Sequence, residues 1–216
     1  MSEIVVGLTD YLLTLESAFF VWLLIRTDGG TPEIRRFFVT FFGFMALASL
    51  TGGTYHIMFP DSSSLPAAIV WKATVVAIGA VAFSAWAIGA YLLFAKPVSS
   101  RIIAAALIAF LIYSIYIVAF DDHFRVAIAN YVPAIVFLAI SFAYCYRRHS
   151  ELPILIGLLG LDITGIAAAV QWLGISLHPS YFNHNATYHL IQALGLFLIF
   201  ITGIFFARTP YQPAWR

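Results

Sequence analysis

Two histidines near the ends of apolar segments are the side chains of this chain best placed to bind a metal. His56 lies about three residues before the end of segment 37–58, and His189 lies about three residues into segment 186–207. At ~1.5 Å per residue, both imidazoles are expected roughly 5 Å below the same surface. His184 lies just outside His189, at the mouth of this layer. Imidazoles that lie at the same depth in a helix bundle can coordinate one zinc ion. The sequence therefore predicts a zinc site of His56, His184 and His189.

Simpler roles for these side chains remain open. His184 and His189 are about 140° apart around a helix, so both can face one metal only if His184 belongs to a non-helical start. Asn183 and Asn185 favour such a start, because asparagine prefers helix caps. Gln192, one turn further in, could orient an imidazole. Equally, the histidines could hydrogen-bond to backbone or water at an interface.

Two carboxyl groups lie near the middle of apolar segments: Glu16 in segment 4–26 and Asp162 in segment 153–177. At such depth an ionisable group costs at least roughly 2.5–3.5 kcal/mol unless it is paired or hydrated. Both are therefore expected to be buried in the interior, either protonated or paired with each other or with Lys72. Lys72 could instead extend to the headgroups beside Trp71.

The element that must hold these residues is a bundle of membrane-spanning helices. Of the 216 residues, 62% are hydrophobic and only 10% are charged, and the mean hydropathy is +0.94. A soluble domain of this length could not keep so apolar a surface in water. Apolar segments long enough to span a bilayer lie at 4–26, 37–58, 67–95, 102–120, 126–146, 153–177 and 186–207. The sequence thus predicts an all-α, polytopic protein with a single seven-helix transmembrane domain over 1–216.

Charge is segregated between the two sides of the predicted bundle. The first, third and fifth connections and the C-terminus hold Arg26, Arg35, Arg36, Lys96, Arg101, Arg147, Arg148, Arg208 and Arg216. The other connections carry only Arg125 among basic residues, with Asp61, Asp121 and Asp122. The positive-inside rule then places the N-terminus outside and the C-terminus in the cytoplasm. The expected location is an integral, multi-pass protein of a bacterial inner membrane.

The first apolar segment is interpreted as a helix rather than a signal peptide, because it lacks a basic start and holds Asp10 and Glu16. The single cysteine, Cys145, excludes a disulfide framework and a cysteine-based metal site. No nucleotide-binding loop is visible, and no nucleic-acid partner is expected. No feature identifies a protein partner.

The seven segments, the position of His56 and the run NATYHLIQALG at 185–195 resemble the superfamily of alkaline ceramidases, adiponectin-type receptors and related seven-helix hydrolases. The resemblance implies zinc held by a histidine of the second helix and a His-x3-His pair opening the seventh, with a serine and an aspartate completing the site. In that family a metal-bound water cleaves a lipid amide.

The carry-over of the family's pattern is partial. His56 matches the helix-two histidine, and His189 matches the second histidine of the pair. Asn185 stands at the first histidine position, with His184 one residue away. The serine position holds Gly52, near the hydroxyls of Ser49 and Thr51, and Lys72 is the only charge of segment 67–95 where the family has an aspartate.

Three functions follow from these residues. The first is a zinc-dependent hydrolase of an amide or ester lipid, in which Thr51 or Lys72 stabilises the oxyanion. The second is a non-enzymatic receptor or sensor for a small apolar ligand, which the missing ligand and acid favour. Its cavity would be lined by Tyr55, Trp71, Trp172, Tyr181 and Phe182. The third is a proton or ion path that runs past Gln192 and Gln171 to Glu16 and Asp162.

Overall fold

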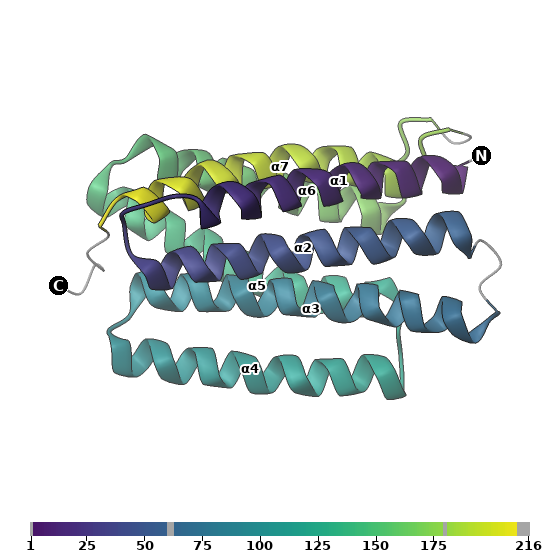
Figure 1. Cartoon of the computed structure of the whole chain (residues 1–216), viewed down its shortest axis with the longest axis horizontal. Helices are drawn as coiled ribbons and strands as arrows, with labels where there is room; N and C mark the ends of the chain where they lie inside the picture. Colours follow the sequence, from purple (N-terminus) through teal and green to yellow (C-terminus); the bar gives the residue numbers. More distant parts are fainter. Residues whose placement is uncertain (1, 60–62, 179–180, 211–216) are drawn as a thin grey trace.

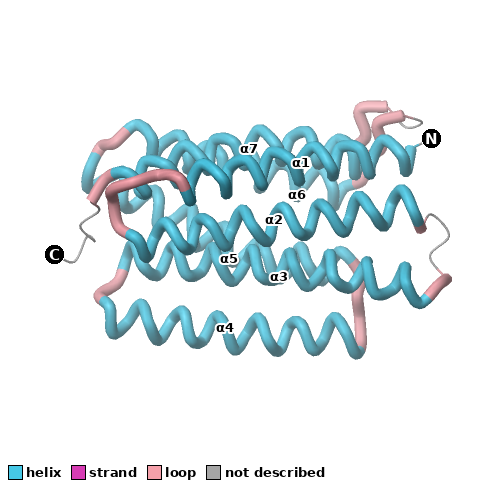
Figure 2. Tube along the Cα trace, in the orientation of Figure 1, coloured by secondary structure: helices cyan, strands magenta, loops and turns pink. Residues whose placement is uncertain are grey.

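The fold is known from a computed structural model, which describes residues 2–59, 63–178 and 181–210. The described residues form seven α-helices: α1 (Ser2–Ile25), α2 (Pro32–Met58), α3 (Leu65–Leu93), α4 (Lys96–Ala119), α5 (Phe124–His149), α6 (Leu152–Leu173) and α7 (His184–Arg208). Figure 2 shows the short connections between them. The predicted all-helical fold is confirmed. Asp61 and Arg216, which entered the charge argument, lie outside the described residues.

Helix ends depart from the predicted segments where polar residues are helical or a glycine stops the helix. Helix α2 begins at Pro32 and α4 at Lys96, both earlier than hydropathy indicates, and each has a proline in its first turn. Proline suits that position because its missing N–H would have no helical partner there. Helix α6 ends at Leu173, because Gly174 adopts a left-handed conformation with φ of 70°.

Six of the helices form a closed ring in the order α1, α2, α3, α5, α6 and α7, and α7 packs back onto α1. Helix α4 packs against α3 outside this ring, at the lower edge of Figure 1. Successive helices alternate in direction, so α1, α3, α5 and α7 all begin at one end of the bundle. We call it the N-terminal end. The predicted depth layer of histidines requires this arrangement.

Phenylalanine rings fill the part of the bundle further from the N-terminal end. The rings of Phe20 and Phe200 stack with centroids 4.2 Å apart, and Phe42 meets both edge-on. Phe38 and Phe206 extend the same cluster, and all of these side chains are buried. The dense packing of these rings leaves no room for a ligand in this part of the bundle. Space for a ligand is therefore expected nearer the N-terminal end.

Glycines bring two pairs of helices into backbone contact. A Cβ on Gly53 of α2 would lie 2.9 Å from the carbonyl oxygen of Gly7 on α1. A Cβ on Gly160 of α6 would lie 2.7 Å from the carbonyl oxygen of Gly195 on α7. Small residues allow this approach, which gives apolar helices close packing that lipid cannot supply. The first crossing holds α1 against α2 beside Asp10 and His56.

Candidate functional site

A cavity of about 230 Å³ opens near the N-terminal end, inside the ring of helices. Since one water occupies roughly 30 Å³ of liquid, this space can hold more than a single water. The lining residues share a mixed character, with polar groups set among apolar and aromatic ones: Asp10, Leu13, Met45, Ala48, Ser49, Gly52, His56, Trp71, Thr74, Ile78, Phe124, Gln171, His184, Asn185, Tyr188 and His189. The three histidines predicted from the sequence therefore face one cavity.

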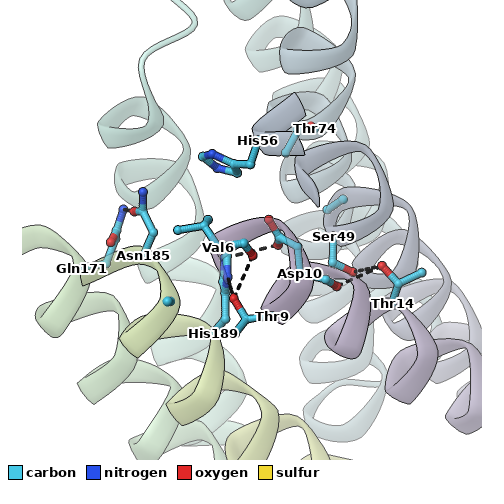
Figure 3. A network of polar contacts seen from close by, with 12 residues as sticks. Val6, Thr9, Asp10, Thr14, Ser49, His56, Thr74, Gln171, Asn185 and His189 are labelled. Atoms are coloured by element: carbon cyan, nitrogen blue, oxygen red, sulfur yellow. Dashed lines mark hydrogen bonds and ion pairs between the residues drawn. The ribbon is translucent and has the colours of Figure 1, made fainter. Parts of the chain in front are cut away.

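The most buried ionisable pair of the cavity joins α1 to α7. Asp10 Oδ1 lies 3.2 Å from His189 Nε2, and both residues are buried. On its other side, the imidazole Nδ1 lies 2.9 Å from the hydroxyl of Thr9, as Figure 3 shows. Asp10 fits against α2 because Gly52 has no side chain: a Cβ there would lie 3.2 Å from Asp10 Oδ2.

The Thr9 hydroxyl determines the proton position on His189. Its single hydrogen donates to the carbonyl oxygen of Val6, at 2.8 Å. Thr9 must therefore accept at its contact with His189, so Nδ1 of the imidazole carries a proton. Nε2 then meets Asp10 in one of two ways: as a lone pair that accepts from a protonated carboxyl, or as the N–H of an imidazolium facing a carboxylate. In both, Asp10 and His189 share one proton.

We expect nuclear magnetic resonance to find a proton on Nδ1 of His189. The ¹⁵N shifts of histidine-labelled protein in detergent distinguish the two ring nitrogens. Thr9→Val removes the acceptor and should change the Nδ1 shift of His189, while the exposed ring of His123 should stay unchanged. A His189 ring protonated only at Nε2 would contradict the assignment.

His56 is held in a similar way at the mouth of the cavity. Its Nδ1 lies 2.7 Å from Glu3 Oε2, across the α1–α2 contact. Its ring packs edge-on near Tyr55 and Trp71. A carboxylate oxygen accepts a hydrogen bond from the imidazole. This contact therefore favours the tautomer of His56 in which Nδ1 carries the proton and Nε2 carries a lone pair. His56 and His189 are thus both oriented through Nδ1 by residues of α1.

Helix α7 begins with a capped turn that places the remaining polar groups. The side chain of Asn183 caps the helix by accepting from the Ala186 N–H at 3.1 Å. His184 is therefore the first helical residue, which corrects the expectation of a non-helical start there. The amide of Gln171 on α6 donates to Asn185 Oδ1 at 2.6 Å. Asn185 consequently binds a neighbouring helix at the position where the resembling family has a histidine.

A second cavity, of about 520 Å³, lies beside the first between α5 and α6. The two share Phe124, Gln171 and His184. The guanidinium of Arg125 lies 5.4 Å from the ring centroid of Trp172, and both line this second cavity. In the connection before α5, hydrogen bonds from His123 lower the pKa of the exposed Asp121 carboxyl below its usual value.

Two other predicted site residues lie away from the main cavity. Lys72 Nζ donates to the Val118 carbonyl at the end of α4, at 2.7 Å, so it extends outward. Thr74 lines the cavity, and its hydroxyl donates to the Thr51 hydroxyl at 2.9 Å. Neither Lys72 nor Thr51 is among the lining residues. Their predicted role at an oxyanion stays a prediction.

The two mid-helix carboxyls do not pair as expected. The prediction that Asp162 is buried is wrong: its side chain is exposed on the surface of α6, because the neighbouring Leu161 and Thr164 take the inward face. Glu16 is half-buried, and Lys72 bonds to α4 instead of to it. A path that runs through Glu16 and Asp162 inside the bundle therefore has no continuous interior route.

Gln192 is buried, as predicted, one turn below His189. It faces a small cavity of about 20 Å³ together with Tyr131 and Thr164. The side-chain amide of Gln192 and the hydroxyls of Tyr131 and Thr164 have no hydrogen-bond partner among the described residues. Ile78, Phe124 and Tyr188 line both this space and the main cavity, so these side chains lie between the two.

Sequence reasoning missed the residues of α1 that orient the imidazoles: Glu3, Thr9 and Asp10. A signal for Asp10 was present. It lies at helical spacing with Val6, Leu13 and Ser17, and these four side chains belong to the buried face of α1. An acid on the buried face of a helix indicates a functional or paired group. Of the aromatic residues predicted to line the cavity, Trp71 does so, Trp172 lines the second cavity, and Tyr55 contacts Trp71.

The predicted zinc ligands do not form a coordination shell in the described part of the chain. There, no group of three or more His, Cys, Asp or Glu side chains lies close enough to hold one metal ion. His56, His184, His189 and Asp10 face the same cavity but stand too far apart, as placed, for shared coordination. Zinc at these residues stays a prediction.

The described residues form seven helices that are each long and apolar enough to cross a membrane, and these define the chain as an integral, multi-pass membrane protein. Its outer faces carry large exposed apolar side chains, as a lipid environment requires. The chain belongs to a family of unknown function, DUF6962, which matches residues 5–207. No curated protein and no solved structure matches it. The matched region covers the lining residues from Asp10 to His189, and the resemblance to alkaline ceramidases stays a prediction.

Proposed function

We propose that this protein is a membrane receptor or sensor that binds a small, mainly apolar ligand in the cavity at its N-terminal end. The observation that carries the proposal is the convergence of side chains from six helices on one space of about 230 Å³. The buried Asp10–His189 pair offers the polar end of such a ligand a hydrogen-bonding partner. Leu13, Met45 and Ile78 offer its apolar part a surface.

The ring of contacts explains how binding could be sensed. Helices α1 and α7 are joined at the cavity by Asp10, Thr9 and His189. A ligand that hydrogen-bonds to Asp10 would compete with this link, and so would change the relative stability of two packings of α1 against α7. The coupling requires only a difference in ligand affinity between the two packings.

The test is extraction of the bound molecule from detergent-purified protein, followed by mass spectrometry. Ala48→Leu fills the cavity, since Ala48 is buried and lines it. Ala105→Leu on the exposed face of α4 is the matched control. We expect a small molecule in near-stoichiometric amount from the wild type and the control, and its loss from Ala48→Leu. An identical extract from all three proteins would refute the proposal.

A zinc-dependent lipid hydrolase is the second candidate. The observation that favours it is that His56 and His189 are both hydrogen-bonded through Nδ1, which is how proteins commonly orient metal-binding imidazoles. The donors as placed do not fit one metal ion, however, so zinc would require them to move together. No reaction step is proposed through the metal.

Elemental analysis of the purified protein tests this candidate. If zinc is bound, His56→Ala and His189→Ala should each abolish stoichiometric metal. The control is His123→Ala, which changes an exposed histidine in a loop and should leave the metal content unchanged. Retention of zinc in His56→Ala would contradict the predicted zinc site. Wild-type protein without metal would leave the receptor as the function.

We also propose that the N-terminal end of the bundle faces outward, which in a bacterial inner membrane is the periplasm. The support is the position of the basic residues at the opposite end of the bundle. Each lies in the first or last turn of a helix or just beyond it: Arg26, Arg35, Lys96, Arg147 and Arg208. A cytoplasm-dependent reporter fused after Arg216 should be active. Activity of a periplasm-dependent reporter at that position would invert the layout.

A further inference from the structure

The described residues that line the main cavity include an acid and several aromatic rings. Asp10 lies on its α1 wall and is only 5% exposed. Two basic residues at the same end of the bundle are directed elsewhere. Lys72 bonds to the Val118 carbonyl, and Arg125 packs over Trp172 in the second cavity. Among the described residues that line the main cavity, Asp10 is thus the only acidic one, and none is a lysine or an arginine.

Aromatic rings from three helices line the space that Asp10 faces, and their centroids follow one another closely. Ring centroids lie 4.9 Å apart for Tyr55 and Trp71, 6.3 Å for Trp71 and Phe124, and 6.3 Å for Phe124 and Tyr188. Trp71, Phe124 and Tyr188 belong to three different helices, yet all line the cavity. The faces of such rings carry partial negative charge and attract cations, tryptophan most strongly.

The Asp10 carboxyl is fixed where it can receive a ligand group. Its Oδ1 lies 3.2 Å from His189 Nε2, and Gly52 has no side chain that would meet its Oδ2. Other titratable groups that face this cavity are His56, His184 and Tyr188.

We propose that the ligand carries an ammonium group, which binds between the Asp10 carboxylate and the aromatic wall of Trp71, Phe124 and Tyr188. This inference rests on the proposed ligand-binding function and names the chemical class of the ligand: a small amine-bearing amphiphile. The ammonium donates hydrogen bonds to Asp10, and its alkyl part lies along Leu13, Met45 and Ile78. The Asp10 carboxylate would repel an anion. A neutral alcohol carries no positive charge, so the faces of the rings would not attract it as they attract a cation.

The experiment compares three probes of equal length on the full chain in detergent: butylammonium, butanol and butyrate. Binding is measured as the ligand-dependent rise in unfolding temperature and by quenching of tryptophan fluorescence, with Trp71 in the cavity wall. We expect butylammonium alone to bind. Asp10→Asn keeps the size of the side chain and should weaken butylammonium by about tenfold or more. Asp162→Asn, which removes an exposed acid of α6, should leave it unchanged.

A second variant keeps the inference testable if Asp10→Asn unfolds. Trp71→Leu removes the central ring of the wall and should weaken butylammonium several-fold without creating affinity for butyrate. Equal binding of butanol and butylammonium, or binding of butyrate, would overturn the ammonium inference and leave the ligand-binding cavity standing. Binding of butylammonium that is insensitive to both variants would overturn it as well. Failure of all three probes, together with an empty solvent extract, would overturn the inference and the proposed function.

Discussion

Replacing Gly160 by alanine should destabilise the bundle by about 2 kcal/mol or more, because the added methyl group meets backbone atoms that cannot move alone. The new Cβ would lie 2.7 Å from the Gly195 carbonyl oxygen and 2.9 Å from the Ile199 nitrogen. Helices α6 and α7 would have to separate along their whole contact. The loss is expected although alanine favours helix over glycine by roughly 0.8–1 kcal/mol.

Gly165 provides the matched control on the same helix. A Cβ there meets nothing within 4 Å, so Gly165→Ala gains helix propensity without a clash. Unfolding of both variants by sodium dodecyl sulfate in mixed micelles gives the comparison. We expect a large loss for Gly160→Ala and no loss, or a small gain, for Gly165→Ala. Equal effects would mean that α6 and α7 do not touch at Gly160.

The helices could be predicted because a membrane span requires a long apolar run, and this requirement is strong in every segment. Their ends could not, because hydropathy marks the lipid-embedded part only. The polar turns that start α2 at Pro32 and α4 at Lys96 are helical outside that part. The close approach at Gly52 and Gly53 was predictable in kind, but its partners, Asp10 and Gly7, were not. Such partners depend on which helices are neighbours in the ring.

The site was predicted in part for the same reason. Counting depth from helix ends correctly brought His56, His184 and His189 to one cavity. Depth says nothing about rotation around a helix axis, so Asp162 was expected to face inward and instead faces out. Asp10 was not predicted as a site residue, yet it faces inward. Its helical spacing from Val6 and Leu13 indicates the buried face of α1.

The Asp10–His189 contact should show strong coupling in a double-mutant cycle. Asp10→Leu leaves the Nε2 side of a buried imidazole without its partner, and His189→Leu leaves a buried carboxyl facing the cavity alone. Removing one member of a buried pair typically costs 3–5 kcal/mol. Because this pair borders an open cavity that water can enter, we expect a smaller loss of about 2 kcal/mol for each single change.

The double change removes both polar groups at once and leaves the Thr9 hydroxyl with its bond to the Val6 carbonyl. Its loss should therefore fall short of the sum of the single losses by about 1–2 kcal/mol, since no orphaned group remains. Glu16→Leu with His189→Leu is the control cycle, because Glu16 makes no contact with the imidazole, and its effects should add. The four proteins of each cycle are compared by unfolding in the same mixed micelles. Additive losses for Asp10 and His189 would show that α1 and α7 are not joined through this pair, and the orientation of His189 would then depend on Thr9 alone.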